Sequence, residues 1–133
     1  MKKIASLLLL LSTSFLITSC SKEDDGQSNN PLKGTIWSFE DEVTVINPTY
    51  FTRYIEFVDQ NTVQVWDTDN NGRIYTGTYT VNGNKVLFHN LHDTYWEWYY
   101  VDGTFSSKSL TISYSYNGQN SGPYYHQTYT KEQ

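Results

Sequence analysis

Apolar and polar residues alternate over short stretches of this chain, the pattern of strands that bury one face. In residues 109–116 the following side chains share one face, opposite small hydroxyl residues: Leu110, Ile112, Tyr114 and Tyr116. No stretch shows the i, i+3, i+4, i+7 spacing of an amphipathic helix. The pattern predicts strands at Thr35–Ile46, Thr52–Val58, Thr62–Thr68, Arg73–Val81, Lys85–Asn90, Thr94–Val101, Ser109–Tyr116 and Tyr124–Lys131.

Turn residues separate these stretches. Four dipeptides are typical of tight hairpins because both residues tolerate positive φ: Asn71-Gly72, Asn82-Gly83, Asp102-Gly103 and Asn117-Gly118. Weaker turn candidates lie at 59–61 and 90–93. About eight antiparallel strands joined in this way predict an all-β, up-and-down meander, and closing it into a small barrel removes the exposed edges. Gly77, in the middle of the fourth strand, predicts a bulge or kink.

Side-chain direction is clear in most of these strands. Ile55 and Phe57 share a buried face, and Val63 and Val65 lie opposite Trp66.

The predicted strand 94–101 is aromatic on both faces. Trp96, Trp98 and Tyr100 share one face, and Glu97 lies between two tyrosines on the other. We place Trp96 and Trp98 inside, because the opposite face carries the charge.

Composition supports a β fold and narrows the possible partners. From Pro31 onward there is no Ala, Met or Cys, while all but one of the 22 Trp, Tyr and Phe residues fall there. Good helix formers are therefore scarce and strand formers abundant. The 133 residues carry a net charge of −5 with no cluster of Lys and Arg after the N-terminus, which argues against a nucleic-acid partner.

The N-terminus has the pattern of an export signal. Lys2 and Lys3 precede an apolar stretch over residues 4–17, which is too short to cross a bilayer as a helix. We therefore expect residues 1–19 to be a signal peptide, residues 20–30 a disordered acidic tether, and residues 31–133 the β-barrel domain.

The segment Ile17-Thr18-Ser19-Cys20 resembles the bacterial lipobox. The resemblance implies cleavage before Cys20 and lipidation of its thiol, which would anchor the protein in the outer membrane. Residues 21–25, a lysine followed by three acidic residues, resemble the surface-export signal of some Gram-negative lipoproteins. That would place the protein on the cell surface, and the alternative is a position on the periplasmic face.

Two segments resemble small bacterial lipocalin-like domains. Residues 32–37, Leu-Lys-Gly-Thr-Ile-Trp, are similar to the Leu-x-Gly-Thr-Trp opening of that family, with Ile36 as an additional residue. Residues 77–86 are similar to its Gly-x-Tyr-x-Val-x-Gly-Asn hairpin. The resemblance implies a barrel with an apolar lumen, often with a ligand.

Aromatic side chains are the main candidates for a binding site. Trp and Tyr rings can stack on sugars or apolar ligands, but a small core without Ala or Met can also be filled with rings. The candidate ligand-binding residues are Trp66, Trp96, Trp98, Tyr100, Tyr114 and Tyr116.

Sites for metals or catalysis are weaker candidates. His89 and His92 lie in a predicted turn and lack the i, i+4 spacing of helical zinc motifs, and residues 67–72 resemble the opening of a calcium loop but lack its Glu at position twelve. Residues 40–42 and Glu97 could supply paired carboxylates, but nothing fixes their separation. We therefore expect no metal, no cofactor and no enzymatic activity.

Two functions remain. One is a lipid-anchored barrel that binds a small apolar or sugar-like ligand through lumen or mouth aromatics. The alternative is a surface interaction module, an adhesin or inhibitor, with a filled core and no small ligand. An open lumen lined by Trp or Tyr favours the first, and a packed interior with exposed rings favours the second.

Overall fold

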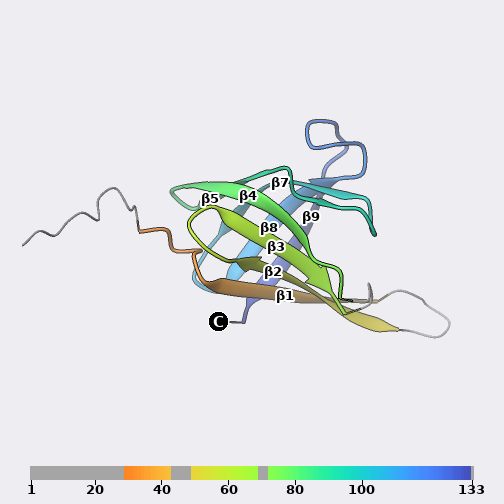
Figure 1. The fold of residues 1–133 in the computed structure, drawn as a ribbon, viewed down its shortest axis with the longest axis horizontal. Helices are drawn as coiled ribbons and strands as arrows, with labels where there is room; N and C mark the ends of the chain where they lie inside the picture. Colours follow the sequence, from red (N-terminus) through yellow and green to blue (C-terminus); the bar gives the residue numbers. More distant parts are fainter. Residues whose placement is uncertain (1–28, 43–48, 69–71, 133) are drawn as a thin grey trace, which may run out of the picture.

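The chain forms a closed antiparallel β-barrel without helices in residues 29–42, 49–68 and 72–132, the parts that the computed structural model describes (Figure 1). The strands are β1 (Thr35–Glu42), β2 (Tyr50–Phe57), β3 (Thr62–Asp67), β4 (Tyr75–Asn82), β5 (Lys85–His89), β6 (His92–Asp93), β7 (Trp98–Phe105), β8 (Ser109–Ser115) and β9 (Tyr125–Lys131). The predicted signal peptide and lipobox and most of the predicted tether lie outside the described residues.

Strands adjacent in the chain pair with each other, except β5 and β6, and two further pairings close the barrel. β1 pairs with β9, and β5 pairs with β7 through Lys85–Leu87 and Asp102–Thr104. The result is an eight-stranded up-and-down barrel with the two-residue β6 as an extra strand beside β7. The predicted all-β meander is therefore confirmed.

The interior is occupied by the inward-facing side chains of the strands. Burial alternates strictly in β2 and β3, as period-two patterning requires. Large aromatic residues from distant strands meet there, for example Trp37, Tyr79 and Tyr129, each no more than 1% exposed. The core comprises Leu32, Trp37, Ile55, Phe57, Val63, Val65, Tyr79, Val86, Phe88, Leu91, Trp98, Tyr100, Leu110, Ile112, Tyr114 and Tyr129.

Local turn chemistry accounts for several hairpins. Asp59 Oδ1 accepts hydrogen bonds from the backbone N–H groups of Asn61 and Thr62, which fixes the turn between β2 and β3. These bonds to the ionised carboxylate lower the pKa of Asp59. Gly83 has φ +63° at the first central position of the β4–β5 hairpin, a conformation that favours glycine.

The predicted strand Thr94–Val101 is wrong in its boundaries. Residues 94–97 form a turn in which Asp93 Oδ1 accepts from the backbone N–H groups of Tyr95 and Trp96 at 2.9 and 3.2 Å. β7 begins only at Trp98, so Trp96 and Trp98 do not lie on one strand face. The aspartate satisfies the turn's donors, which outweighs the strand preference of the aromatic residues.

The predicted turn at Asp102-Gly103 is also wrong, because both residues lie inside β7. The β7–β8 register shifts between Tyr100 and Asp102. A Cβ on Gly103 would lie 2.8 Å from the Thr111 carbonyl oxygen, so close approach of β8 explains this glycine. Gly77 is explained in the same way, because a Cβ there would lie 2.8 Å from that of Leu91. The β3–β4 register runs through Gly77 without a shift, so the bulge predicted at this position is wrong.

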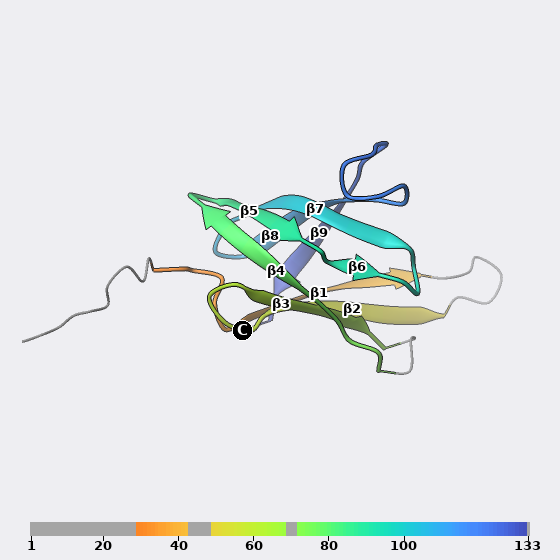
Figure 2. The same cartoon turned by 45° about the horizontal axis from the view of Figure 1, so that its top comes forward.

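The barrel has two distinct ends. The proximal end comprises residues 29–34, where the described chain enters, together with the turns at 58–61, 83–84 and 106–108. The distal end comprises the strand ends and connections at 49–50, 68, 72–74, 90–97 and 116–124. The 116–124 loop (blue) stands out from the barrel in both views (Figures 1 and 2). Across the described ranges, no helix has the length and apolar character needed to span a membrane.

Candidate functional site

Exposed apolar side chains are concentrated at the distal end. Among the described residues, eight large hydrophobic side chains are exposed, and six of them are placed at this end by the ends of their strands. The other two are Val58 and Leu87. We define the tyrosine surface as Tyr50, Ile74, Tyr95, Tyr116, Tyr124 and Tyr125, whose side chains are 43% to 58% exposed. Of these six residues, Tyr116 and Tyr125 are in ring contact, and exposed apolar side chains that share one end of a domain mark a candidate interaction site.

A continuous series of ring contacts leads from this surface into the barrel. Tyr125 and Tyr116 have centroids 5.3 Å apart, Tyr116 and Tyr114 are 5.8 Å apart, and Tyr114 stacks on Trp98 at 3.7 Å. Tyr114 and Trp98 are buried. Burial raises the pKa of Tyr114 to about 12, with a further contribution from the neighbouring Tyr116, so its hydroxyl is neutral at physiological pH.

At the inner end of this series lies a buried arginine. Arg53 is on β2, on the same inward face as Ile55 and Phe57, and is 3% exposed. Its guanidinium carbon lies 3.5 Å from the centroid of Trp98 and 4.6 Å from that of Trp96. Desolvated cation–π contacts of this kind stabilise a buried cation by about 2 kcal/mol or more. Within the described structure, Nε and Nη1 of Arg53 have no hydrogen-bond partner.

Two buried carboxylates accompany this arginine. Asp67 lies opposite Arg53 in the β2–β3 register, and its Oδ2 accepts a 2.6 Å hydrogen bond from the indole Nε1 of Trp96. Asp93 is 2% exposed. Loss of hydration raises the pKa of Asp93, while its backbone hydrogen bonds and the charge of Arg53 act in the opposite direction. The positive charge of Arg53 and the carboxylates of Asp67 and Asp93 therefore partly compensate one another.

The predicted ligand residues fall into three places. Trp98, Tyr100 and Tyr114 are buried in the barrel, where each is in contact with other rings. Trp96 is half-buried in the 94–97 turn and stacks on Phe51 at 5.0 Å.

The remaining two lie outside the core. Tyr116 follows the end of β8 and is 46% exposed, so its predicted position on the inward face is wrong. Trp66 is on the outer surface, opposite Val65 as predicted, and stacks on Tyr54 at 5.3 Å. The structure therefore brings Trp96, Trp98, Tyr114 and Tyr116 together at the distal end and separates Trp66 from them.

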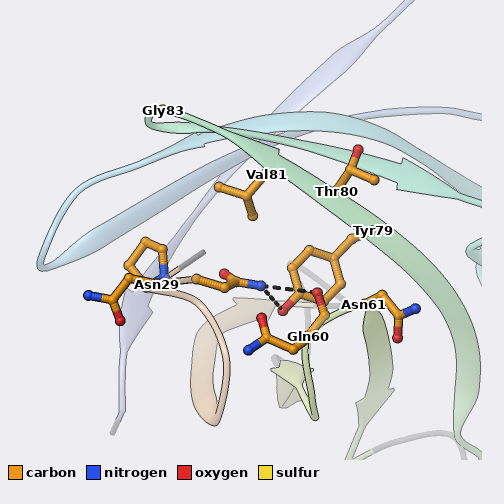
Figure 3. A pocket seen from close by; sticks show the side chains of 9 residues that line it. Asn29, Gln60, Asn61, Tyr79, Thr80, Val81 and Gly83 are labelled. Atoms are coloured by element: carbon orange, nitrogen blue, oxygen red, sulfur yellow. Dashed lines mark hydrogen bonds between the residues drawn. The ribbon is translucent and has the colours of Figure 1, made fainter. Parts of the chain in front are cut away.

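A polar hollow of about 530 Å³ lies at the proximal end (Figure 3). Asn29, Gln60, Asn61 and Thr80 line it, with the edge of Tyr79. The Tyr79 hydroxyl is already engaged, since it donates to the Asp59 carbonyl at 2.6 Å and accepts from Asn30 Nδ2 at 2.7 Å. Its ring is 1% exposed, so this hollow offers amides to a ligand but no ring face.

Neither of the weaker metal candidates forms a cluster in the described residues. No group of three or more His, Cys, Asp or Glu side chains there could hold a metal ion. The ring of His92 stacks on Tyr99 at 3.7 Å, and its Nε2 lies 3.5 Å from Glu97. The 67–72 segment that resembles a calcium loop falls partly outside the described residues.

Sequence reasoning did not identify Arg53. The signal was available, because period-two alternation places residue 53 on the same face as Ile55 and Phe57. A charged residue at an inward position is rare and points to a functional or strained site.

Comparison with protein families, curated proteins and solved structures finds no match to this chain. The fold alone therefore defines its class: a small closed eight-stranded antiparallel barrel, compatible with a lipocalin-like architecture, with an aromatic cluster at its distal end.

Proposed function

We propose that this protein is a non-enzymatic binding protein that holds its ligand or partner on the tyrosine surface of the distal end. One observation carries the proposal: core side chains fill the barrel, while six of the eight exposed large hydrophobic residues in the described chain gather at one end. A packed interior with exposed rings favours the surface interaction module over a binder with an open lumen.

The chemistry of this surface suits ligands with flat apolar faces and polar edges. Tyrosine offers a ring face for stacking and a hydroxyl for hydrogen bonding, at a low cost in side-chain entropy. Sugars, short peptides and apolar small molecules fit this description. The anchor rings would be Tyr116 and Tyr125, because each also contacts Tyr114, whose ring is held in place by Trp98.

The test is a glycan array and a fatty-acid panel probed with the wild-type protein and with Tyr116→Ser/Tyr125→Ser. We expect binding to one ligand class that the double variant loses. Leu87→Ser is the matched control, because Leu87 is 46% exposed on β5, away from the tyrosine surface. Binding that survives the double variant, or that Leu87→Ser removes equally, would contradict the proposal.

A small ligand reaching into the barrel is a second candidate, supported by the unpaired Nε and Nη1 of Arg53. Such a ligand would have to pass the ring of Trp96 and place an acceptor oxygen beside the guanidinium of Arg53. The chain has only two arginines, Arg53 and Arg73, so the Nε–H resonance of Arg53 can be assigned with Arg73→Lys. A shift of that resonance when a ligand is added would support this candidate, and a ligand that binds without shifting it would exclude it.

The proposed location is the outer membrane, through a lipid anchor at Cys20, with the barrel on the cell surface. Several acyl chains together anchor a protein stably, since each buried CH₂ contributes about 0.8 kcal/mol. Cys20→Ser should leave the barrel folded and release it from the membrane fraction. A Ser variant that stays with membranes after a high-salt wash would show that the lipobox interpretation is wrong.

A further inference from the structure

The seam between β1 and β9 is paired along only part of its length. Starting from the proximal end, the ladder stops at the pair Ser38–Thr130. Both strands continue to the distal end, β1 as far as Glu42 and β9 from Tyr125. On its other side, β1 is paired with β2 over its full length. In Figures 1 and 2, β1 and β9 meet near the C-terminus and then diverge.

The direction of the backbone groups of β9 follows from two hydrogen bonds at its proximal end. The N–H of Glu132 donates to the carbonyl of Ile36 at 2.8 Å, on the side of β1. The N–H of the preceding Lys131 donates to the β7–β8 turn, on the opposite side. Successive residues of a strand direct their N–H and C=O groups to opposite sides, so His126 and Thr128 point to the same side as Glu132.

His126 and Thr128 therefore form an open strand edge. A continued ladder would pair Thr128 with Glu40 and His126 with Glu42, but neither pair forms. Both edge residues are exposed, and within the described residues no strand pairs with them on this side. The Thr128 carbonyl accepts a long, 3.5 Å hydrogen bond from the side chain of Gln127. The backbone groups of two residues are thus available to an added strand.

This edge lacks the features that usually protect one. Exposed edges are commonly blocked by charged side chains, a proline or a β-bulge. β9 has the sequence Tyr-His-Gln-Thr-Tyr-Thr-Lys, and its lysine, Lys131, lies beyond the open segment. The pairing of β9 with β8 shows no register shift, so no bulge interrupts the strand. The open segment is therefore suited to pairing with a further strand.

The surroundings of this edge indicate which strand would fit. Across the seam, β1 ends in the acidic segment Glu40-Asp41-Glu42, in which Glu40 is exposed. At its distal end the edge includes Tyr125, a member of the tyrosine surface. Burial raises the pKa of Tyr114, and the charge of Asp41 adds to this rise, so the acidic segment lies near the tyrosine rings. An extended segment with basic and apolar side chains complements both features.

A second copy of this chain would fit the edge less well. β1 covers the same edge from Thr130 onward, so the open segment is limited to residues 125–129 and is flanked by a strand. A second barrel would also bring its own acidic segment towards that of the first, and like charges repel. A single peptide strand needs less room, and basic side chains on it would be attracted.

We propose that the open edge of β9 binds an extended, basic peptide segment of a partner protein by β-strand addition. The peptide backbone would pair with His126 and Thr128, and its basic side chains would face the acidic end of β1. The remaining side chains would contact the tyrosine surface. The inference rests on the proposed function, which it deepens by naming the class of partner. Main-chain hydrogen bonds supply affinity in such complexes, and side chains supply selectivity.

Amide hydrogen exchange of the full chain in detergent micelles tests the edge before any partner is added. The N–H groups of Gln127 and Tyr129 point towards β8 and should exchange slowly, whereas those of His126 and Thr128 should exchange rapidly. Slow exchange at all four positions in dilute protein would overturn the proposal, because the edge would already be paired. Protection that increases with protein concentration would also overturn it, because a second copy would then be the occupant.

The peptide is identified by selecting a phage-displayed library of random heptapeptides against the full chain. We expect the enriched peptides to carry Lys or Arg, with β-branched or aromatic residues at alternate positions. A synthetic copy of the best peptide should slow the exchange of the His126 and Thr128 amides, and N-methylation of its alternate backbone nitrogens should abolish binding. A library without binders, or a bound peptide that leaves both amides fast, would overturn strand addition.

Two variants test the edge itself. Thr128→Pro removes an N–H that the barrel does not use, and should weaken peptide binding about tenfold. Glu40→Lys should weaken it about fivefold at low salt. Glu56→Lys is the matched control, because it makes the same charge change on β2, opposite Ile36 in the proximal half of the barrel. Unchanged affinity in a folded Thr128→Pro or in Glu40→Lys would overturn the proposal, and the N-methylated peptide gives the same test if Thr128→Pro does not fold.

The tyrosine variant separates this inference from the proposed function. If Tyr116→Ser/Tyr125→Ser binds the peptide as tightly as wild type does, the tyrosine surface is refuted as the binding site while the strand pairing stands. If the double variant loses the peptide but Thr128→Pro retains it, the strand pairing is refuted and the tyrosine surface stands.

Discussion

Replacing Trp98 with alanine tests the link between the core and the distal site. Trp98 is 4% exposed, stacks on Tyr114 at 3.7 Å, and lies 3.5 Å from the guanidinium carbon of Arg53. Truncating a buried Trp typically costs about 3–5 kcal/mol. Removing the closest ring over a buried cation adds to this loss, because desolvated cation–π contacts contribute about 2 kcal/mol. A domain of this size has only about 5–15 kcal/mol of stability.

We therefore expect Trp98→Ala to lose at least about 3 kcal/mol of unfolding free energy, a large share of the stability of a domain of this size. Urea denaturation followed by circular dichroism measures the loss. Trp66→Ala is the control, because Trp66 is half-buried on the outer surface and its main ring contact is with Tyr54. That stacking is worth about 0.5–1.5 kcal/mol. If Trp66→Ala were the more destabilising variant, the assignment of inner and outer faces would be refuted.

Two further variants test packing and burial. Gly103→Ala should cost about 1–3 kcal/mol in thermal unfolding, because its Cβ would lie 2.8 Å from the Thr111 carbonyl oxygen, a backbone atom that cannot move aside; an unchanged melting temperature would contradict the close approach. Asp93→Asn keeps the Oδ1 acceptor but does not titrate. Because burial raises the pKa of Asp93, the folded state holds that proton more tightly than the unfolded chain does, and wild-type stability falls as pH rises from about 3.9 through the raised pKa. The stability of Asp93→Asn relative to wild type should therefore increase across this window, as measured by denaturation at a series of pH values, and a constant difference would contradict the pKa shift.

Local sequence features predicted most of the strands. The alternation in 109–116 places Leu110, Ile112 and Tyr114 inside, as the structure confirms. The turn at 59–61 and the Gly83 hairpin are also where the residues indicate, because an Asx turn or a positive φ depends on a few adjacent residues only. Information of this kind is contained within a few positions of the chain.

The predictions of turns and bulges were wrong mainly at glycines. Asp102-Gly103 has the composition of a hairpin turn but lies inside β7, where the glycine admits the backbone of β8. Gly83 is therefore needed for its positive φ, whereas Gly103 and Gly77 are needed because a side chain there would collide with a neighbouring strand or loop. Sequence alone does not separate these needs, because the second depends on a neighbour from another strand.

The sequence by itself determined an all-β chain, the approximate positions of its strands and the order in which they pair. Turn chemistry and period-two alternation act over neighbouring residues, so no distant contact is needed to read them. Only the tertiary structure decided that β5 closes on β7, that Arg53 lies among the rings of Trp96 and Trp98, and that exposed tyrosines gather at one end of the barrel. These features arise from barrel closure, which brings together residues far apart in the chain, and their energies depend on burial that exists only once the barrel has formed.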